Sequence, residues 1–137
     1  MSQYVTFTLG STLYGIDVLR VQEALRSHTR TRVPLAPADV AGLVNLRGQV
    51  VLTVDMRTRM GVALGADDTP MMVVVQVDGE PISLLVDEIG DVVDVGPDSF
   101  ETPPDTLDPA LRSLIRGAHK LDGRLLLVLD VDEAVAA

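Results

Sequence analysis

The chain of 137 residues contains no cysteine and no tryptophan. Without cysteine it can form no disulfide bond, and it has no thiolate to act as a nucleophile or a metal ligand. Its two histidines, His28 and His119, are too few for most hydrolytic zinc sites, and neither is followed by a second histidine or cysteine at ligand spacing. Patterns typical of a serine nucleophile or a phosphate-binding loop are also missing. We therefore predict that the protein is not an enzyme and uses no cofactor and no metal ion.

Basic residues are scarce as well. Eleven lysines and arginines stand against 20 aspartates and glutamates, which leaves a net charge of −9. Nucleic acids and anionic membranes bind basic surfaces, so this balance argues against both as partners. Residues 1–4 lack the basic-then-apolar pattern of an export signal, and the longest apolar runs are too short to span a bilayer. We expect one cytoplasmic domain over residues 1–137.

Aromatic residues make up only 3% of the chain, although hydrophobic residues reach 47%. Valine and leucine supply much of the apolar content, which favours β-strands. A chain of this size cannot bury all of that apolar surface. Some of it is therefore expected to face other proteins.

The most informative feature of the sequence is an internal repeat. Four landmarks recur at one offset of 75 residues: Gly42 and Gly117, Leu46 and Leu121, Gly48 and Gly123, Asp55 and Asp130. A second similarity relates residues 9–17 to residues 78–87, with an offset of 69 at the glycines and 70 at the aspartates. A period near 70 is too long for a solenoid repeat and suits a small barrel. The chain is thus predicted to be two related half-domains.

Alternating apolar residues around glycine turns predict strands through most of the chain. The expected hairpins are Tyr4–Leu9 with Leu13–Val18, Val40–Leu46 with Gln49–Met56, Met71–Val77 with Pro81–Val86, and Ala118–Leu121 with Arg124–Leu129, and Ile89–Val95 is a further strand. Short helices are expected over Val18–Leu25 with Asp17 as the N-cap, after Asp108 with Pro109 at the first position, and over Asp132–Ala136. Residues Arg57–Ala66 are expected to form either a brief helix or a loop. Short antiparallel strands at this spacing favour small barrels. We predict a mainly β fold of two five-stranded barrels, the first over 1–66 and the second over 71–130, with an exchange of the terminal segments left open.

The polar residues suggest few catalytic roles. Most acidic residues lie at turns or strand ends, where solvation or helix capping is the usual role. Asp55 and Asp130 hold equivalent positions, so each is expected to accept hydrogen bonds from nearby backbone N–H groups. Both histidines are expected at the surface.

Arg47 is the polar residue that points most clearly to binding. It lies at a hairpin turn, and its counterpart in the second half is Asp122, so the two tips differ in charge. An arginine on a rigid turn can offer a bidentate fork to a carboxylate of a partner. The alternative is an ordinary solvent-exposed arginine.

Two apolar features add to this indication. The run Val50–Val54 is apolar on both faces of its strand, so one face has no obvious core to enter. Met71 and Met72 begin the second half, and methionines at a seam can adapt to partners of differing shape. Core packing is the alternative for each of them.

Taken together, the motifs resemble a known family. They are Tyr14–Asp17, Val21–Glu23, Asn45–Gly48, Val54–Arg57, Val86–Asp91 and Leu125–Asp130. Their order is similar to that of the chemotaxis coupling protein family, CheW, along nearly the whole chain. The regulatory domain of chemotaxis histidine kinases carries similar motifs, but no kinase domain precedes them here, so we expect a free-standing adaptor.

The resemblance implies two SH3-like barrels with a hydrophobic groove between them, and no enzymatic activity. It implies binding to the cytoplasmic hairpin tip of chemoreceptors and to the regulatory domain of the histidine kinase, in arrays at the membrane. The implied receptor-binding residues are Val21, Glu23, Arg47, Met71 and Met72, although the methionines depart from the small aliphatics of the family. The implied kinase-binding residues are Gly42, Leu46 and Val51.

Two other hypotheses compete with the adaptor. A small-ligand sensor would use the crevice between the barrels, because the apolar seam has polar rims. An enzyme with dispersed carboxylates would depend on a residue such as Asp55.

Overall fold

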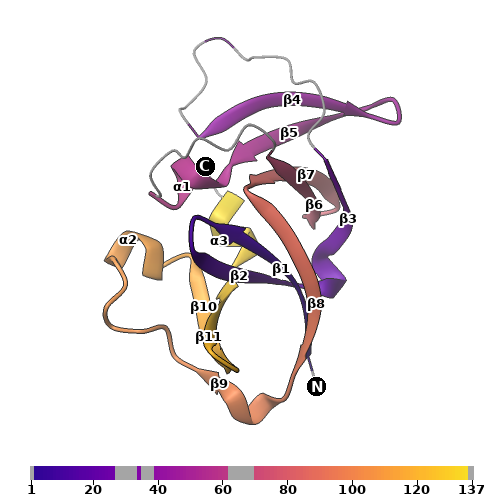
Figure 1. Ribbon diagram of the computed structural model, residues 1–137. Helices are drawn as coiled ribbons and strands as arrows, with labels where there is room; N and C mark the ends of the chain where they lie inside the picture. Colours follow the sequence, from indigo (N-terminus) through magenta and orange to yellow (C-terminus); the bar gives the residue numbers. More distant parts are fainter. Residues whose placement is uncertain (1, 27–33, 35–38, 62–69, 136–137) are drawn as a thin grey trace.

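The computed structural model describes residues 2–26, 34, 39–61 and 70–135 (Figure 1). His28, most of the expected seam at 65–70 and the last residue of the expected helix Asp132–Ala136 lie outside these residues. Within them the chain forms eleven strands and a few helices of one turn or slightly more. The mainly β prediction is confirmed, and the strands form two SH3-like subdomains.

The strands pair into two sheets, which Figure 1 shows one above the other. The central sheet has the order β3-β6-β7-β5-β4. Its strands are β3 (Val21–Arg26), β4 (Val40–Leu46), β5 (Gln49–Asp55), β6 (Met71–Val77) and β7 (Glu80–Val86). The terminal sheet has the order β8-β1-β2-β11-β10-β9. Its strands are β1 (Ser2–Leu9), β2 (Thr12–Asp17), β8 (Glu88–Val95), β9 (Phe100–Glu101), β10 (Ile115–Leu121) and β11 (Arg124–Leu129).

The two sheets repeat the same topology. In each, a hairpin joins a second hairpin through a parallel pair, β7 with β5 in one and β2 with β11 in the other. The ladder of β4 and β5 shifts register between Val40 and Gly42, and that of β10 and β11 shifts between Ile115 and Gly117, which preserves the offset of 75. The β1–β2 and β6–β7 hairpins correspond at an offset of 68, because Leu9 and Val77 are the last paired residues before each turn. This corrects the offset of 69 to 70 that the sequence indicates.

The strand pairing does not follow a division at residues 1–66 and 71–130. The strand after each N-terminal hairpin crosses to the other sheet: β3 follows β2 but pairs with β6, and β8 follows β7 but pairs with β1. Each sheet therefore contains strands from both ranges. This exchange makes neither half independent of the other.

The expected helix over Val18–Leu25 is wrong. Only Val18–Arg20 is helical, as the 3-10 turn η1, and β3 begins at Val21. In β3 the half-buried and exposed residues alternate with a period of two, and pairing with β6 provides the backbone partners that a helix would otherwise supply. Asp17 still caps the turn, since its Oδ1 accepts a hydrogen bond from the Leu19 N–H at 3.0 Å.

Three other short helices overlap the regions where helices are expected, although the first begins at Met56, which the sequence placed at the end of a strand. They are α1 (Met56–Arg59), α2 (Pro109–Arg112) and α3 (Val131–Val135), and Pro97–Ser99 forms a second 3-10 turn, η2, in the loop that precedes β9. Asp55 caps α1 by accepting from the Arg57 N–H at 3.0 Å, and Asp130 accepts from the Glu133 N–H at 3.2 Å. The capping role expected for both aspartates is thus confirmed.

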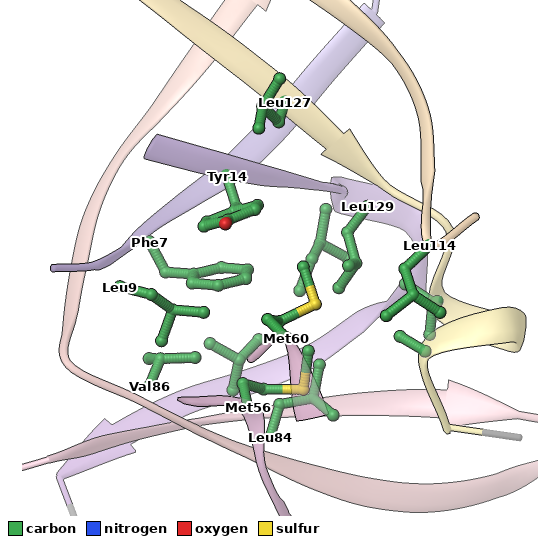
Figure 2. Packing of buried hydrophobic residues seen from close by; sticks show 14 of the residues in the cluster. Phe7, Leu9, Tyr14, Met56, Met60, Leu84, Val86, Leu114, Leu127 and Leu129 are labelled. Carbon is green, nitrogen blue, oxygen red and sulfur yellow. The ribbon is translucent and has the colours of Figure 1, made fainter. Parts of the chain in front are cut away.

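A single hydrophobic cluster fills the space between the two sheets (Figure 2). Phe7 stacks on Tyr14 at 5.4 Å between ring centroids, and both belong to the same cluster as Met56 and as Leu84 of the central sheet. The centre of the interface between the sheets is therefore a packed core. Burial of this core joins the two subdomains into one unit.

A charged contact also joins the sheets at the edge of this core. The guanidinium of Arg57, on α1, donates two hydrogen bonds to the carboxylate of Asp87, which also accepts a hydrogen bond from the Gly10 N–H at 2.7 Å. Gly10 belongs to the β1–β2 turn, so one carboxylate ties the central sheet to the terminal sheet. Both charged side chains are largely buried, at 16% and 12% exposed.

Candidate protein-interaction site

The β4–β5 hairpin presents Arg47 at its tip. Arg47 and Gly48 both have positive φ, 53° and 83°, which is the backbone of the tight turns that join antiparallel strands. The Asn45 side chain stabilises the turn by accepting a hydrogen bond from the Gly48 N–H at 3.0 Å. Arg47 lies at this turn, and 76% of its side chain is exposed.

Arg47 reaches from the tip to Glu23 on β3. Its two terminal nitrogens donate to the two carboxylate oxygens of Glu23, and this bidentate contact raises the pKa of Arg47. Since β3 and β4 are the two ends of the central sheet, the ion pair spans the edges that close this barrel. The structure thus brings together two residues that the sequence assigned to one binding function.

The other residues expected on the receptor side lie at different depths. Val21 and Met71 are partly buried against the core between the sheets, and each keeps some exposed surface. Met72 is fully buried, and with Val44 and Leu85 it forms the small core of the central barrel. Met72 can therefore affect a partner only through the shape of the barrel.

The residues expected on the kinase side are mostly interior. Val51 is 1% exposed, and Gly42 is buried at the register shift with a φ of 137°. Leu46 is half-buried. The outward face of β5 instead carries Val50, which is 63% exposed, and Leu52, which is 39% exposed. These two side chains are the ones that a partner could reach. The period of two predicts that one face is unburied, but the sequence alone does not say which face.

The prediction of a surface position for His119 is wrong. Its side chain is 2% exposed, between the rings of Tyr4 and Phe100 at 5.5 and 5.1 Å. Its Nδ1 lies 2.7 Å from the hydroxyl of Ser99, and its Nε2 has no partner. Burial lowers the pKa of this imidazole. The strand β9, which the sequence did not predict, covers it.

Two cavities open on the terminal sheet. One, of about 470 Å³, is polar and is lined by Asp17, Arg20 and Asp132 among others, and Arg20 already binds Asp132 at 2.6 Å. The other, of about 400 Å³, lies between β8 and the β10–β11 tip. A packed core occupies the centre of the interface between the sheets, where the sensor hypothesis would place a crevice.

Two further findings bear on the class of protein. Among the described residues, no group of three or more histidine or acidic side chains is arranged to hold a metal ion. No helix in that part of the chain has the length and apolar character needed to cross a membrane. The fold is that of a small β protein of two SH3-like subdomains, and its β4–β5 hairpin exposes Arg47 at the tip and Val50 and Leu52 on one face.

Comparison with known proteins agrees with this class. The family model described as the CheW-like domain matches residues 3–137, so the chain belongs to the CheW family. It is 30% identical over 132 residues to the chemotaxis protein CheW of Rhizobium meliloti, covering 95% of this chain and 84% of that protein. It is 29% identical over 134 residues to the chemotaxis protein CheW of Treponema pallidum, covering 94% and 79%.

A solved structure shares the whole fold. The crystal structure of the scaffolding protein TtCheW from Thermoanaerobacter tengcongensis superposes with a TM-score of 0.87 at 26% identity. The match covers 99% of this chain and 88% of that one. The family resemblance seen in the motifs is thereby confirmed.

Proposed function

We propose that this protein is a non-catalytic adaptor that couples chemoreceptors to the chemotaxis histidine kinase. The observation that carries the proposal is the family match along residues 3–137, together with the scaffolding role in the name of the structural neighbour. The protein would act in the cytoplasm and be recruited there to receptor arrays at the membrane.

The receptor side of the proposed site is built around Arg47 and Glu23. A helical hairpin tip binds through a few apolar anchors and charge-assisted hydrogen bonds. Val21 and Met71 offer partly exposed apolar surface on the same barrel, and the guanidinium of Arg47 is exposed enough to exchange Glu23 for a receptor carboxylate. Met72 supports this surface from inside.

The kinase side is proposed on the β4–β5 hairpin. Val50 and Leu52 form its exposed apolar face, and Leu46 is half-buried beside the tip. Covering these aliphatic side chains with a partner would be favourable roughly in proportion to the apolar area removed from water. Gly42 and Val51 would act by fixing the course of the hairpin that carries these side chains.

A pull-down with two partners tests the proposal. A receptor cytoplasmic fragment and the regulatory domain of the kinase should each be retained by the immobilised protein. Arg47→Asp should reduce retention of the receptor fragment, and Val50→Ser with Leu52→Ser should reduce retention of the kinase domain. Arg112→Ala, an exposed arginine on α2, serves as the matched control and should change neither. If both partners fail to bind the unmodified protein, the proposal is wrong.

A further inference from the structure

The internal repeat allows a residue-by-residue comparison of the two barrels. In the central sheet, Glu23 and Leu25 on β3 lie opposite Val74 and Met72 on β6. In the terminal sheet, Val92 and Val93 on β8 lie opposite Val5 and Tyr4 on β1, so that Val93 corresponds to Leu25 and Tyr4 to Met72. These registers share the structural offset of 68, which places Asp91 at the position of Glu23. The offset of 75 places Asp122 at the position of Arg47.

The ion pair of Arg47 with Glu23, which we call the clasp of the central barrel, is therefore only half present in the terminal barrel. In the central barrel, a carboxylate on the edge strand receives an arginine from the opposite hairpin tip. In the terminal barrel the carboxylate is retained as Asp91, but the tip carries a second carboxylate, Asp122. Among the described residues, no ion pair is formed by either aspartate.

A cavity lies at this unclasped position. It has a volume of about 400 Å³ and is lined by both Asp91 and Asp122. Its walls are apolar, with Leu13, Ile89, Val93 and Leu121 among them. Glu88 and Arg124 also line it, so three carboxylates face one guanidinium.

We propose that this cavity receives an arginine side chain from a partner protein, at the place that Arg47 occupies in the other barrel. The methylene groups of the arginine would pack on the apolar walls, and its guanidinium would lie between the two aspartates. An arginine suits the site better than a bare cation, since a planar fork can bind two carboxylates while its stem fills apolar space. The inference is independent of the receptor and kinase assignments, because it concerns the other barrel.

The first test uses a peptide probe. A capped pentapeptide with arginine between alanines is titrated into the ¹⁵N-labelled full chain, and amide shifts are followed by NMR. Saturable shifts are expected in β8 and the β10–β11 tip, and the same peptide with citrulline, the neutral isostere of arginine, should produce none. Equal shifts with citrulline, or shifts confined to the Arg47 hairpin, would overturn the proposal.

Variants of the tip make the test specific. Asp122→Asn should weaken binding about tenfold, as expected for the loss of one charge-assisted hydrogen bond. Asp78→Asn, at the equally exposed β6–β7 turn, should leave binding unchanged. Asp122→Arg should restore the internal clasp to Asp91 and abolish binding, with little change in melting temperature because the new pair is exposed. Unchanged peptide affinity in Asp122→Asn and Asp122→Arg would refute the proposal.

A second copy of the chain is the competing source of the arginine. Analytical ultracentrifugation of the unmodified protein distinguishes the two sources. A monomer at the concentrations used for NMR supports a different protein as the partner. Self-association that disappears in Arg47→Ala would assign the arginine to a second copy and overturn the proposal.

Discussion

Arg47, at the tip of the β4–β5 hairpin, binds Glu23 on β3 with both of its terminal nitrogens, and the pair bridges the two edge strands of the central sheet. The arginine is exposed, so the pair can serve both the closure of the barrel and the recognition of a partner.

A charge swap separates these two roles. Arg47→Asp places a second carboxylate beside Glu23, and we expect weaker receptor binding with little change in melting temperature, because exposed pairs contribute little stability. The double variant Glu23→Arg with Arg47→Glu rebuilds the pair with reversed polarity. It should melt like the unmodified protein and still fail to bind. Restored binding in the double variant would show that only barrel closure matters.

Burial makes Met72 a structural residue. Met72→Ala should destabilise the protein by about 2–5 kcal/mol, since the small core with Val44 and Leu85 cannot collapse around the lost atoms. Met72→Leu keeps the volume and should cost less than about 1.5 kcal/mol. Urea denaturation measures both. A stable Met72→Ala variant that loses receptor binding would instead indicate direct contact with the receptor.

The contact between the sheets through Asp87 gives a second stability prediction. Asp87→Asn removes the charge that faces Arg57, and a buried ion pair that loses one partner costs about 3 kcal/mol or more. Asp132→Asn removes a carboxylate whose partner, Arg20, lies in an exposed pair, and it should change the urea midpoint little. Similar midpoints for the two variants would contradict the importance of the contact between Arg57 and Asp87.

His119 predicts a dependence of stability on pH. Because burial lowers the pKa of its imidazole, protonation below the usual value of about 6.5 favours the unfolded chain. The contribution of this residue to stability is complete above pH 6.5 and is lost as the pH falls toward the lowered pKa. His119→Gln should therefore show a smaller fall in melting temperature than the unmodified protein between about pH 7.5 and 5.5. Parallel profiles would show that His119 does not titrate in this range.

The sequence predicted most of the local structure because the local signals are strong. Tight hairpin turns require a positive φ, which Asp78–Gly79 and Arg47–Gly48 adopt, and both turns form as expected. Asp55 and Asp108 precede short helices and accept hydrogen bonds from their first backbone N–H groups. The repeat at an offset of 75 also corresponds to equivalent strands.

The remaining features depend on contacts between distant residues. Val21–Arg26 forms a strand because it pairs with Met71–Val77, about fifty residues further on, and no local pattern specifies that partner. His119 is buried because Phe100 and Ser99 cover it, although the loop between them and β10 has no regular pattern. Positions 50 and 51 are both valine, and only the course of the strand in the barrel determines that Val51 is buried and Val50 is exposed.

The central claim is that one copy of this chain holds a receptor and a kinase at the same time. Sedimentation velocity of the purified protein with a receptor cytoplasmic fragment and the kinase regulatory domain measures this directly. We predict a three-component complex that sediments faster than either two-component complex and is lost with Arg47→Asp. Receptor and kinase fragments that displace each other from the protein, with no three-component species, would contradict the account.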